Sequence, residues 1–238
     1  MALSRKRRKD DVFVAAPFGR DPYHRLSPTD VRVSWGEPFI TCRTGDWMLE
    51  KLPKEVGQAL RSARPGLAAL TFNDQGLERV DLEIVVRSSA FADGGPMGPR
   101  YTADGPGVSP PLEWSGVPVG AQTLVLLIED ADSPTPEPLV HAIAYNLPAP
   151  AGMLEEAALP SANHRSEGIL MGRASDLRTE YLPPDPPRGH GRHRYAFQLF
   201  ALEAPLSFGT PPGRSDIVEA LRERAVAKGV LIGTYERS

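Results

Sequence analysis

Several features that mark common protein classes are missing from this sequence of 238 residues. Its only cysteine is Cys42, so an intrachain disulfide and a multi-cysteine metal site are both excluded. No stretch approaches the roughly 20 apolar residues that a membrane-spanning helix needs. The basic run at residues 5–9 is followed by two aspartates rather than by an apolar segment, which argues against a secretory signal. The sequence therefore predicts a cytoplasmic protein with no integral membrane association.

An excess of charge of one sign is also missing. The formal net charge is -3 and the isoelectric point is near 6.0. Nucleic acids and anionic membranes attract clustered positive charge, which this balance does not supply. We therefore expect no nucleic-acid partner, and any anion must be bound by a local site. What the sequence does contain is turn-forming residues, with 25 prolines and 22 glycines, and these predict many short elements joined by turns.

Strand patterns dominate from residue 82 onward. Leu82, Ile84 and Val86 alternate with the period of a strand. Apolar runs follow at residues 123–128, 139–145, 194–202 and 230–235. The run at residues 194–202 is apolar on both faces, which is typical of a central strand. Strands at this spacing predict a mostly β fold, in the form of an antiparallel β-sandwich.

A short helix is expected before the strands, from Pro53 to the helix-breaking pair Pro65-Gly66. This helix gives a natural division of the chain. We expect a poorly ordered extension at residues 1–47, a helical lead-in and linker at residues 48–81, and the β domain at residues 82–238. One hypothesis is that translation starts naturally at Met48.

A second helix is expected near the carboxyl end. Ser215 is a suitable cap residue, and Ile217, Leu221 and Ala225 share one face of the helix that would follow. Gly229 is placed to end it. A final strand at residues 230–235 then completes the β domain.

Polar residues inside strongly apolar strands are the informative ones, because most others suit turns or surfaces. Asp130 and Asp132 close one apolar run, and His141 shares a strand face with Leu139, Ile143 and Tyr145 by simple alternation. The segment Gly-Arg-His-Arg-Tyr at residues 191–195 opens the central strand, with His190 just before it. Each has an ordinary structural explanation, such as a hydrogen-bonded core histidine. Together, at strand ends, they predict one pocket for a phosphate-type anion. The carboxylate could also meet an ammonium group, so a zwitterionic ligand would use both.

Two other functions compete with a binding pocket. Asp130, His141, His190 and His193 are residue types that ligate zinc and activate water, so a hydrolase is the alternative. The sequence has no His-Glu-x-x-His pair and no obvious nucleophile, and we therefore expect no enzyme activity, no metal and no cofactor. An inhibitor that docks on a kinase or protease is a third class, for which no inhibitory loop is identifiable.

Four ordered motifs resemble the phosphatidylethanolamine-binding protein family, especially its bacterial, Raf-kinase-inhibitor-like branch. They are Tyr-Thr-Ala-Asp-Gly at residues 101–105, Ser-Pro-Pro-Leu-Glu-Trp at residues 109–114, Asp-Ala-Asp-Ser-Pro at residues 130–134 and Gly-Arg-His-Arg-Tyr at residues 191–195. The resemblance covers about residues 82 to 236. It implies a β-sandwich of two antiparallel sheets, a regulatory or binding function directed at phosphate-type ligands or phospholipid head groups, and a homodimer.

The resemblance also implies roles for individual residues. The ligand-binding set is Asp130, His141, Pro186, Pro187, Gly191, His193 and Tyr195, with the two prolines at the rim. Asp132 and Arg194 fall where a buried ion pair would support the pocket walls. The sequence departs from the family at residues 174–177, where Ala-Ser-Asp-Leu replaces a segment that often begins Asn-Ser-Phe, and at Val140 before the histidine. These departures leave the rim specificity open.

Overall fold

The structure is a computed structural model that describes residues 30–33, 40–43, 53–149 and 152–237. Backbone contacts divide the chain into two units, Met1–Trp47 and Met48–Ser238. In the first unit, β1 (Asp30–Val33) pairs antiparallel with β2 (Ile40–Arg43). Val31, Val33 and Trp35 alternate along the sequence in the pattern of a short strand; β1 covers the first two, and Trp35 lies outside the described residues. Most of the expected extension at residues 1–47, including its basic run, lies outside the described residues.

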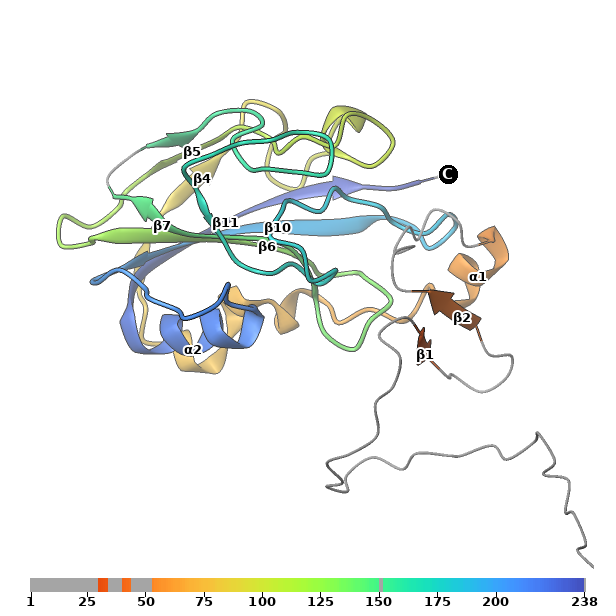
Figure 1. Ribbon diagram of the computed structural model, residues 1–238, viewed down its shortest axis with the longest axis horizontal. Helices are drawn as coiled ribbons and strands as arrows, with labels where there is room; N and C mark the ends of the chain where they lie inside the picture. Colours follow the sequence, from red (N-terminus) through yellow and green to blue (C-terminus); the bar gives the residue numbers. More distant parts are fainter. Residues whose placement is uncertain (1–29, 34–39, 44–52, 150–151, 238) are drawn as a thin grey trace, which may run out of the picture. The chain divides into compact units, whose positions relative to one another are not determined.

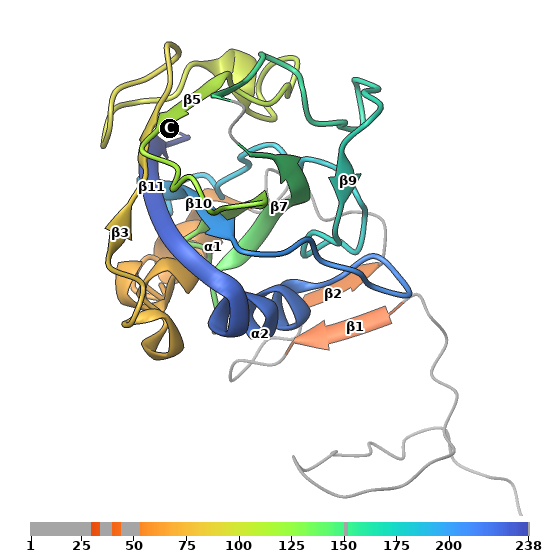
Figure 2. The same cartoon turned by 90° about the vertical axis from the view of Figure 1, so that its left-hand side faces the viewer.

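The second unit is mostly β, as predicted, and its main component is a six-stranded sheet (Figures 1 and 2). Its strands, in spatial order, are β3 (Leu82–Glu83), β11 (Ala225–Tyr235), β10 (His193–Leu202), β6 (Thr123–Asp130), β7 (Leu139–Pro148) and β9 (Leu170–Met171). The pair β11 and β3 is parallel, whereas the other neighbours are antiparallel. The sheet is therefore mixed, and the expectation of wholly antiparallel sheets was wrong.

A three-stranded sheet comprises β4 (Val85–Arg87), β5 (Leu112–Ser115) and β8 (Met153–Leu154). The single strand expected at Leu82 to Val86 is divided between this sheet and the larger one. Ile84 marks the division: its N–H donates to the Lys228 carbonyl at 2.9 Å, and its side chain is buried. The alternating pattern thus identified extended chain but not the change of sheet within it.

The central strands β6 and β10 are apolar on both faces because both faces of the six-stranded sheet are covered. Along β6, Leu124, Leu126 and Ile128 belong to one buried cluster, which also contains residues of the three-stranded sheet. Val125 and Leu127 belong to a second cluster that contains residues of α2 (Arg214–Arg224). In Figure 1, α2 lies on the opposite side of the central strands from β4 and β5. The central position expected for β10 is confirmed.

The first helix, α1 (Lys54–Ala59), is shorter than the sequence suggested. Leu60 ends it, with φ -89° and ψ 2° and with its carbonyl oxygen accepting a hydrogen bond from the Ala63 N–H at 2.8 Å. The same lead-in region continues into the core of the second unit. Leu77 and Val80 are buried in the cluster that contains α2.

The second helix differs from the expectation at both ends. It begins after Gly213, whose N–H donates to the Asp216 carboxylate at 2.8 Å, so Ser215 is not its cap. It ends at Arg224, and β11 starts at once because Ala225 pairs with Leu202. Gly229 therefore lies within a strand. A Cβ there would come within 1.9 Å of the Ile84 carbonyl oxygen, so close backbone approach, not helix termination, requires the glycine.

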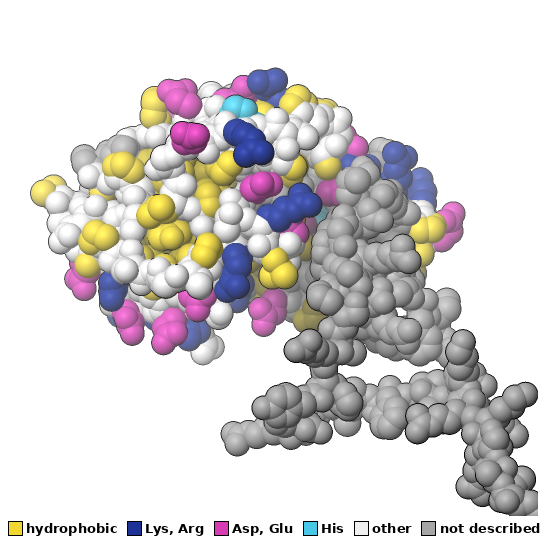
Figure 3. Space-filling model, in the orientation of Figure 1, with side chains coloured by type: hydrophobic (Ala, Val, Ile, Leu, Met, Phe, Trp, Pro, Cys, Tyr) yellow, Lys and Arg dark blue, Asp and Glu magenta, His cyan; other side chains and the backbone are white. Residues whose placement is uncertain are grey.

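The surface of the described residues carries both signs of charge. On the face drawn in Figure 3, basic and acidic side chains are interspersed rather than gathered by sign. In the described part of the chain, none of the helices has both the length and the apolar character required to cross a bilayer.

Candidate ligand-binding site

The candidate site lies where three neighbouring strands of the six-stranded sheet place polar side chains at the same end. Asp130 ends β6, and it lies opposite Tyr195 near the start of β10. His193 is the first residue of β10, and His141 comes from β7 on the other side of β6. All four residues are buried, with none more than 4% exposed. Strand register alone thus gathers four of the residues that the sequence assigned to the pocket.

A β-bulge decides the direction of His141. Ile128 pairs with Ala142 and Glu129 pairs with Val140, so His141 is the extra residue between the two pairs. Simple alternation had placed its imidazole on the same face as Ile143, but Ile143 belongs to the cluster on the α2 side. The imidazole instead contacts the ring of Tyr195 edge to face, with centroids 5.1 Å apart. The predicted face was wrong because the bulge shifts the alternation by one residue.

A chain of hydrogen bonds runs through Asp130, His193 and His190. The Asp130 Oδ2 lies 2.7 Å from the His193 Nδ1, and the His193 Nε2 lies 2.7 Å from the His190 Nδ1. At the far end, the His190 Nε2 donates to the carbonyl oxygen of Leu60 at 2.8 Å. The other Asp130 oxygen accepts from the Asp132 N–H at 2.8 Å. Every nitrogen of the two imidazoles therefore has a protein partner.

His141 and Tyr195 each keep one buried polar atom without a partner. The His141 Nδ1 donates to the carbonyl of Leu182 at 2.6 Å, whereas the Nε2 has no hydrogen-bond partner. The Tyr195 hydroxyl has none either. Burial lowers the pKa of His141 more than the charge of Asp130 raises it, and burial raises the pKa of Tyr195 well above its usual value. At neutral pH the imidazole is therefore neutral and the hydroxyl keeps its proton.

Asp132 and Arg194 form the ion pair that the sequence suggested. The Arg194 Nε and Nη2 donate to the two carboxylate oxygens at 2.7 and 2.6 Å, and the Arg194 N–H adds a third bond at 2.9 Å. Arg64 of the lead-in joins them, with its Nη1 3.1 Å from Asp132. Burial alone raises the pKa of Asp132, but the two guanidinium groups outweigh it and hold the pKa below its usual value. The carboxylate stays charged.

The loop between Tyr181 and β10 positions the histidines through its backbone. Its Leu182 N–H donates to the His141 carbonyl at 2.7 Å, in addition to the side-chain bond above. Pro186 and Pro187 are buried in this loop. Gly191 has φ +98°, and a Cβ there would lie 3.3 Å from the Nη2 of Arg64. The structure thus sets Gly191 against the lead-in, whereas ring contacts and a hydrogen bond join Asp130, His141, His193 and Tyr195 into one cluster.

Three contributors were not identified as site residues from the sequence. His190 stands just before the central strand and was grouped with the pocket histidines and with the possible zinc ligands, but it was not assigned to the ligand-binding set. No local sequence signal pointed to Arg64, because its contact with Asp132 joins segments far apart in the sequence. Leu60 contributes through a carbonyl oxygen, which no side-chain pattern can reveal. In the described residues, no three His, Cys, Asp or Glu side chains are grouped as a metal site would require.

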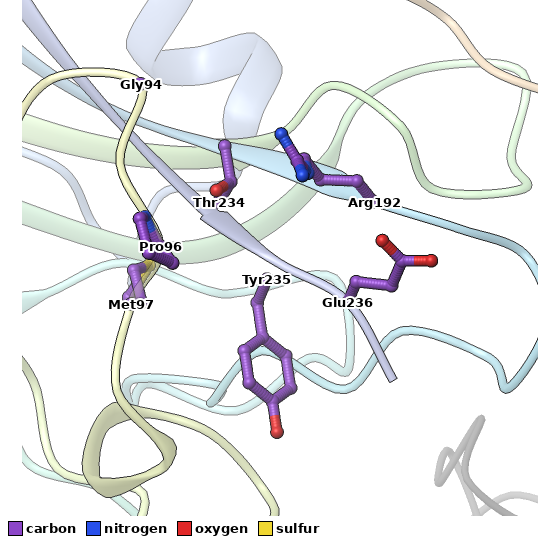
Figure 4. Close-up of a pocket in the computed structure, with 7 residues that line it drawn as sticks. All are labelled: Gly94, Pro96, Met97, Arg192, Thr234, Tyr235 and Glu236. Carbon is purple, nitrogen blue, oxygen red and sulfur yellow. The ribbon is translucent and has the colours of Figure 1, made fainter. Parts of the chain in front are cut away.

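A separate surface pocket of about 290 Å³ lies on the neighbouring strand. Figure 4 shows its lining, which includes Met97, Arg192, Tyr235 and Glu236. None of the four clustered residues lines it. This pocket and the buried cluster are therefore different places in the structure.

Comparisons with known proteins agree with the fold and with the motifs around the cluster. The sequence profile of the family described as phosphatidylethanolamine-binding protein matches residues 87–236. A UPF0098 protein of Methanothermobacter thermautotrophicus is 36% identical over 152 residues, which are 64% of this chain and 98% of the relative. The candidate lipoprotein LppC of Mycobacterium tuberculosis is 32% identical over 155 residues, which are 64% of this chain and 72% of the relative.

A solved structure shares the same fold. It is described as a phosphatidylethanolamine-binding protein homologue from Chlamydia trachomatis, with 32% sequence identity and a TM-score of 0.59. The similarity covers 66% of this chain and 100% of that structure. The matched region contains the whole buried cluster, since Asp130, His141, His193 and Tyr195 all lie within residues 87–236.

Proposed function

The chain belongs to the phosphatidylethanolamine-binding protein family, and from this premise we propose that it is a binding protein whose buried cluster holds a small phosphate-type anion. The observation that carries the proposal is the pair of unpartnered polar atoms, the His141 Nε2 and the Tyr195 hydroxyl. Leaving a buried polar atom unpaired costs about 1–3 kcal/mol. A ligand that pairs both atoms removes that cost.

The hydrogen-bonding roles of the two atoms restrict the ligand. Because the His141 Nδ1 donates to Leu182, the Nε2 of the neutral imidazole carries a lone pair and accepts. The Tyr195 hydroxyl can donate. A hydrogen phosphate or a phosphate monoester in its protonated form supplies one acceptor oxygen and one O–H, and it matches both atoms. A fully ionised phosphate group requires His141 to take up a proton first.

The remaining predicted residues have supporting roles in this proposal. Asp130 and His193 form the polar wall beside the ligand, and Pro186, Pro187 and Gly191 belong to the loop that closes over it. Asp132 and Arg194 anchor the segments on which the wall is built. We also propose that the two sheets together make the β-sandwich of the family, with residues 82–238 as its domain and residues 48–81 packed onto it as a lead-in.

No observation favours the hydrolase alternative. A hydrolytic base or a zinc ligand needs a nitrogen lone pair that can reach water or metal. In this arrangement both nitrogens of His190 and both of His193 are engaged with protein groups. Among the three site histidines this leaves the lone pair of the His141 Nε2, and in the described residues it has no group of further ligating side chains with which to hold a metal. We therefore propose a binding role and no catalysis.

The wider biology is also a proposal. A Raf-kinase-inhibitor-like regulatory role, a homodimer and a cytoplasmic location follow from the family resemblance and the sequence, and each has a direct test. Light scattering after size-exclusion chromatography measures the dimer. Cell fractionation measures location, and a membrane-bound product would match the relative named as a candidate lipoprotein. The intact mass of the native protein tests whether translation starts at Met48.

The decisive experiment is an amide NMR titration of the full chain with phosphate, phosphoethanolamine and acetate. We expect phosphate and phosphoethanolamine to shift signals around His141, Leu182 and Tyr195. Acetate separates recognition of phosphate from recognition of any small oxyanion. Shifts that are absent, or that gather at the surface pocket beside Tyr235, would refute the proposed site.

A further inference from the structure

The hydrogen-bonded chain from Asp130 to Leu60 requires one more proton than two neutral histidines supply. It contains three contacts, and each needs one hydrogen: carboxylate to His193, His193 to His190, and His190 to the Leu60 carbonyl. The carbonyl can only accept, so the His190 Nε2 carries a hydrogen. Two neutral imidazoles hold two hydrogens in total. The complete chain therefore holds a third, and its net charge is zero rather than -1.

The surrounding charges indicate where the third proton lies. Burial and the neighbouring charge of His193 lower the pKa of His190, and Arg64 acts in the same direction, whereas the Leu60 carbonyl and Asp130 oppose them. His193 faces Asp130 on β6 and His190 in the loop, and it stacks on Tyr195. His141 on β7 also senses the charge of His193. The third proton is therefore shared between His193 and Asp130, and His190 stays neutral.

We propose that His190 is a positioning residue that holds a proton on the His193–Asp130 pair, and that the lead-in helix α1 sets this state through the Leu60 carbonyl. The carbonyl fixes the tautomer of His190, with the hydrogen on Nε2 and the lone pair on Nδ1. That lone pair accepts only from a protonated His193 Nε2. His193 then donates at both nitrogens, and the proton count follows from the position of one backbone carbonyl.

Close packing holds the Leu60 carbonyl in place. A Cβ on Gly57 of α1 would lie 2.0 Å from the Arg188 carbonyl oxygen, so the helix and the histidine loop approach as closely as their backbones allow. Arg64 fastens the same contact, because its Nη2 donates to the His190 carbonyl at 2.6 Å and its Nη1 to the Arg192 carbonyl at 2.7 Å. Helix and loop are therefore held against each other by backbone packing and by two hydrogen bonds from Arg64.

The consequence for the pocket rests on the proposed anion-binding function. Without the third proton, the chain of Asp130, His193 and His190 would place one net negative charge beside the anion. At an effective dielectric constant of about 20, a unit charge a few ångströms away changes the affinity for the anion by about tenfold or more. The third proton removes this repulsion. The lead-in helix is thus part of the anion site although none of its side chains faces the ligand in the proposed pocket.

The first test is the ¹⁵N spectrum of the histidine side chains in the free, full-length protein between pH 6 and 9. We expect both nitrogens of His193 to carry hydrogen, or to share one with Asp130, at pH 7.5, because each nitrogen lies in a hydrogen bond that needs one hydrogen. His190 should appear as the neutral tautomer with hydrogen on Nε2. A His193 spectrum of an ordinary neutral imidazole at pH 7.5 would overturn the proposal, whatever the protein binds.

Two variants of His190 separate the proton count from simple packing. His190→Gln keeps an acceptor toward His193 and a donor toward Leu60, so the His193 signals should stay as in the wild type. His190→Leu fills the space without either bond. The His193 spectrum at pH 7.5 should then be that of a neutral imidazole, with phosphate affinity about tenfold weaker. Equal behaviour of the two variants would contradict a role for His190 beyond packing.

A third variant tests the helix. Gly57→Ala displaces α1 from the Arg188 carbonyl and should move the His193 spectrum at pH 7.5 toward that of a neutral imidazole, whereas Glu55→Ala, on an exposed position of the same helix, should not. If phosphate fails to bind the wild type while His193 behaves as described, the proposed function fails and the inference about His190 stands. If phosphate binds but Gly57→Ala leaves the His193 spectrum unchanged, α1 does not determine the protonation state of His193.

Discussion

The imidazole of His141 meets the ring of Tyr195 edge to face at 5.1 Å, and each of the two residues has one buried polar atom with no partner. The contact exists because the bulge at His141 turns this side chain toward β10. Two buried polar atoms without hydrogen-bond partners are unfavourable for the stability of the fold. Their position is explained if the arrangement is selected for a ligand rather than for stability.

The Tyr195 hydroxyl gives the most direct test of that explanation. Tyr195→Phe should weaken phosphate binding by about 10- to 150-fold, since one hydrogen bond to a charged group is lost, at about 1.5–3 kcal/mol. The free energy of unfolding should stay the same or rise by about 1 kcal/mol, because an unpaired hydroxyl leaves the core. Calorimetric titration and chemical denaturation measure the two effects.

Tyr181 provides the matched control. It is also fully buried, but its hydroxyl donates to the Tyr101 carbonyl at 3.0 Å. Tyr181→Phe should therefore lower stability by about 1 kcal/mol and leave phosphate affinity unchanged. If the two substitutions have the same effects, the unpaired state of the Tyr195 hydroxyl has no functional meaning.

Anion binding should be accompanied by proton uptake at His141. Burial holds the pKa of the free imidazole below its usual value, so His141 is neutral at pH 7 and its Nε2 accepts. A bound anion favours the protonated form, and affinity should therefore rise as the pH falls. Calorimetric titration with phosphoethanolamine at pH 7.5, in buffers of different ionisation enthalpy, should give an uptake approaching one proton per ionised phosphate group, because that group has no O–H to donate to the neutral imidazole. An uptake of zero would exclude His141 as the responding group.

His141 should also make stability depend on pH. Its pKa in the folded state is lower than in the unfolded chain, so the unfolded state binds more protons on acidification. The free energy of unfolding should fall as the pH drops below about 6.5, by up to about 1.4 kcal/mol per pH unit for this residue. His141→Asn keeps a donor toward Leu182 and removes the titration. Denaturation at pH 7.5 and 5.5 should show a smaller loss for this variant than for the wild type.

The sequence predicted the central part of the sheet well because burial there follows simple periodicity. Apolar residues on both faces of the segment at 194–202 indicated a central strand, and β10 is one. Predictions from apolar periodicity failed where strand pairing determines the local structure instead. Ala225 and the residues after it continue the pattern of α2 but pair with β10, and a single bulged residue reversed the face of His141.

The site was predictable in its residue types but not in its connections. Asp130 and His193 stood out as polar residues at strand ends, and register brings them together. The proline-rich loop was recognisable as a loop, yet nothing local shows that it returns Leu182 to His141 and His190 to His193. The bond from Arg64 to Asp132 depends on the docking of the lead-in, which is a property of the folded chain alone.

Asp132 should be important for stability even though it does not face the proposed ligand. Its side chain is fully buried and joins Arg194 of β10 to Arg64 of the lead-in. Asp132→Asn removes the negative charge that pairs with both guanidinium groups. Because these groups are partly exposed, we expect the free energy of unfolding to fall by about 2–4 kcal/mol, somewhat less than when a fully buried pair is broken. Asp176→Asn, which weakens a longer contact of 3.8 Å to an exposed Arg178, should cost less than about 0.5 kcal/mol. Urea denaturation of both variants measures the difference.

Because the lead-in loses one anchor, Asp132→Asn should also increase amide hydrogen exchange in residues 54–64. Unchanged exchange there would mean that Arg64 holds the helix through the His190 and Arg192 carbonyls without help from Asp132.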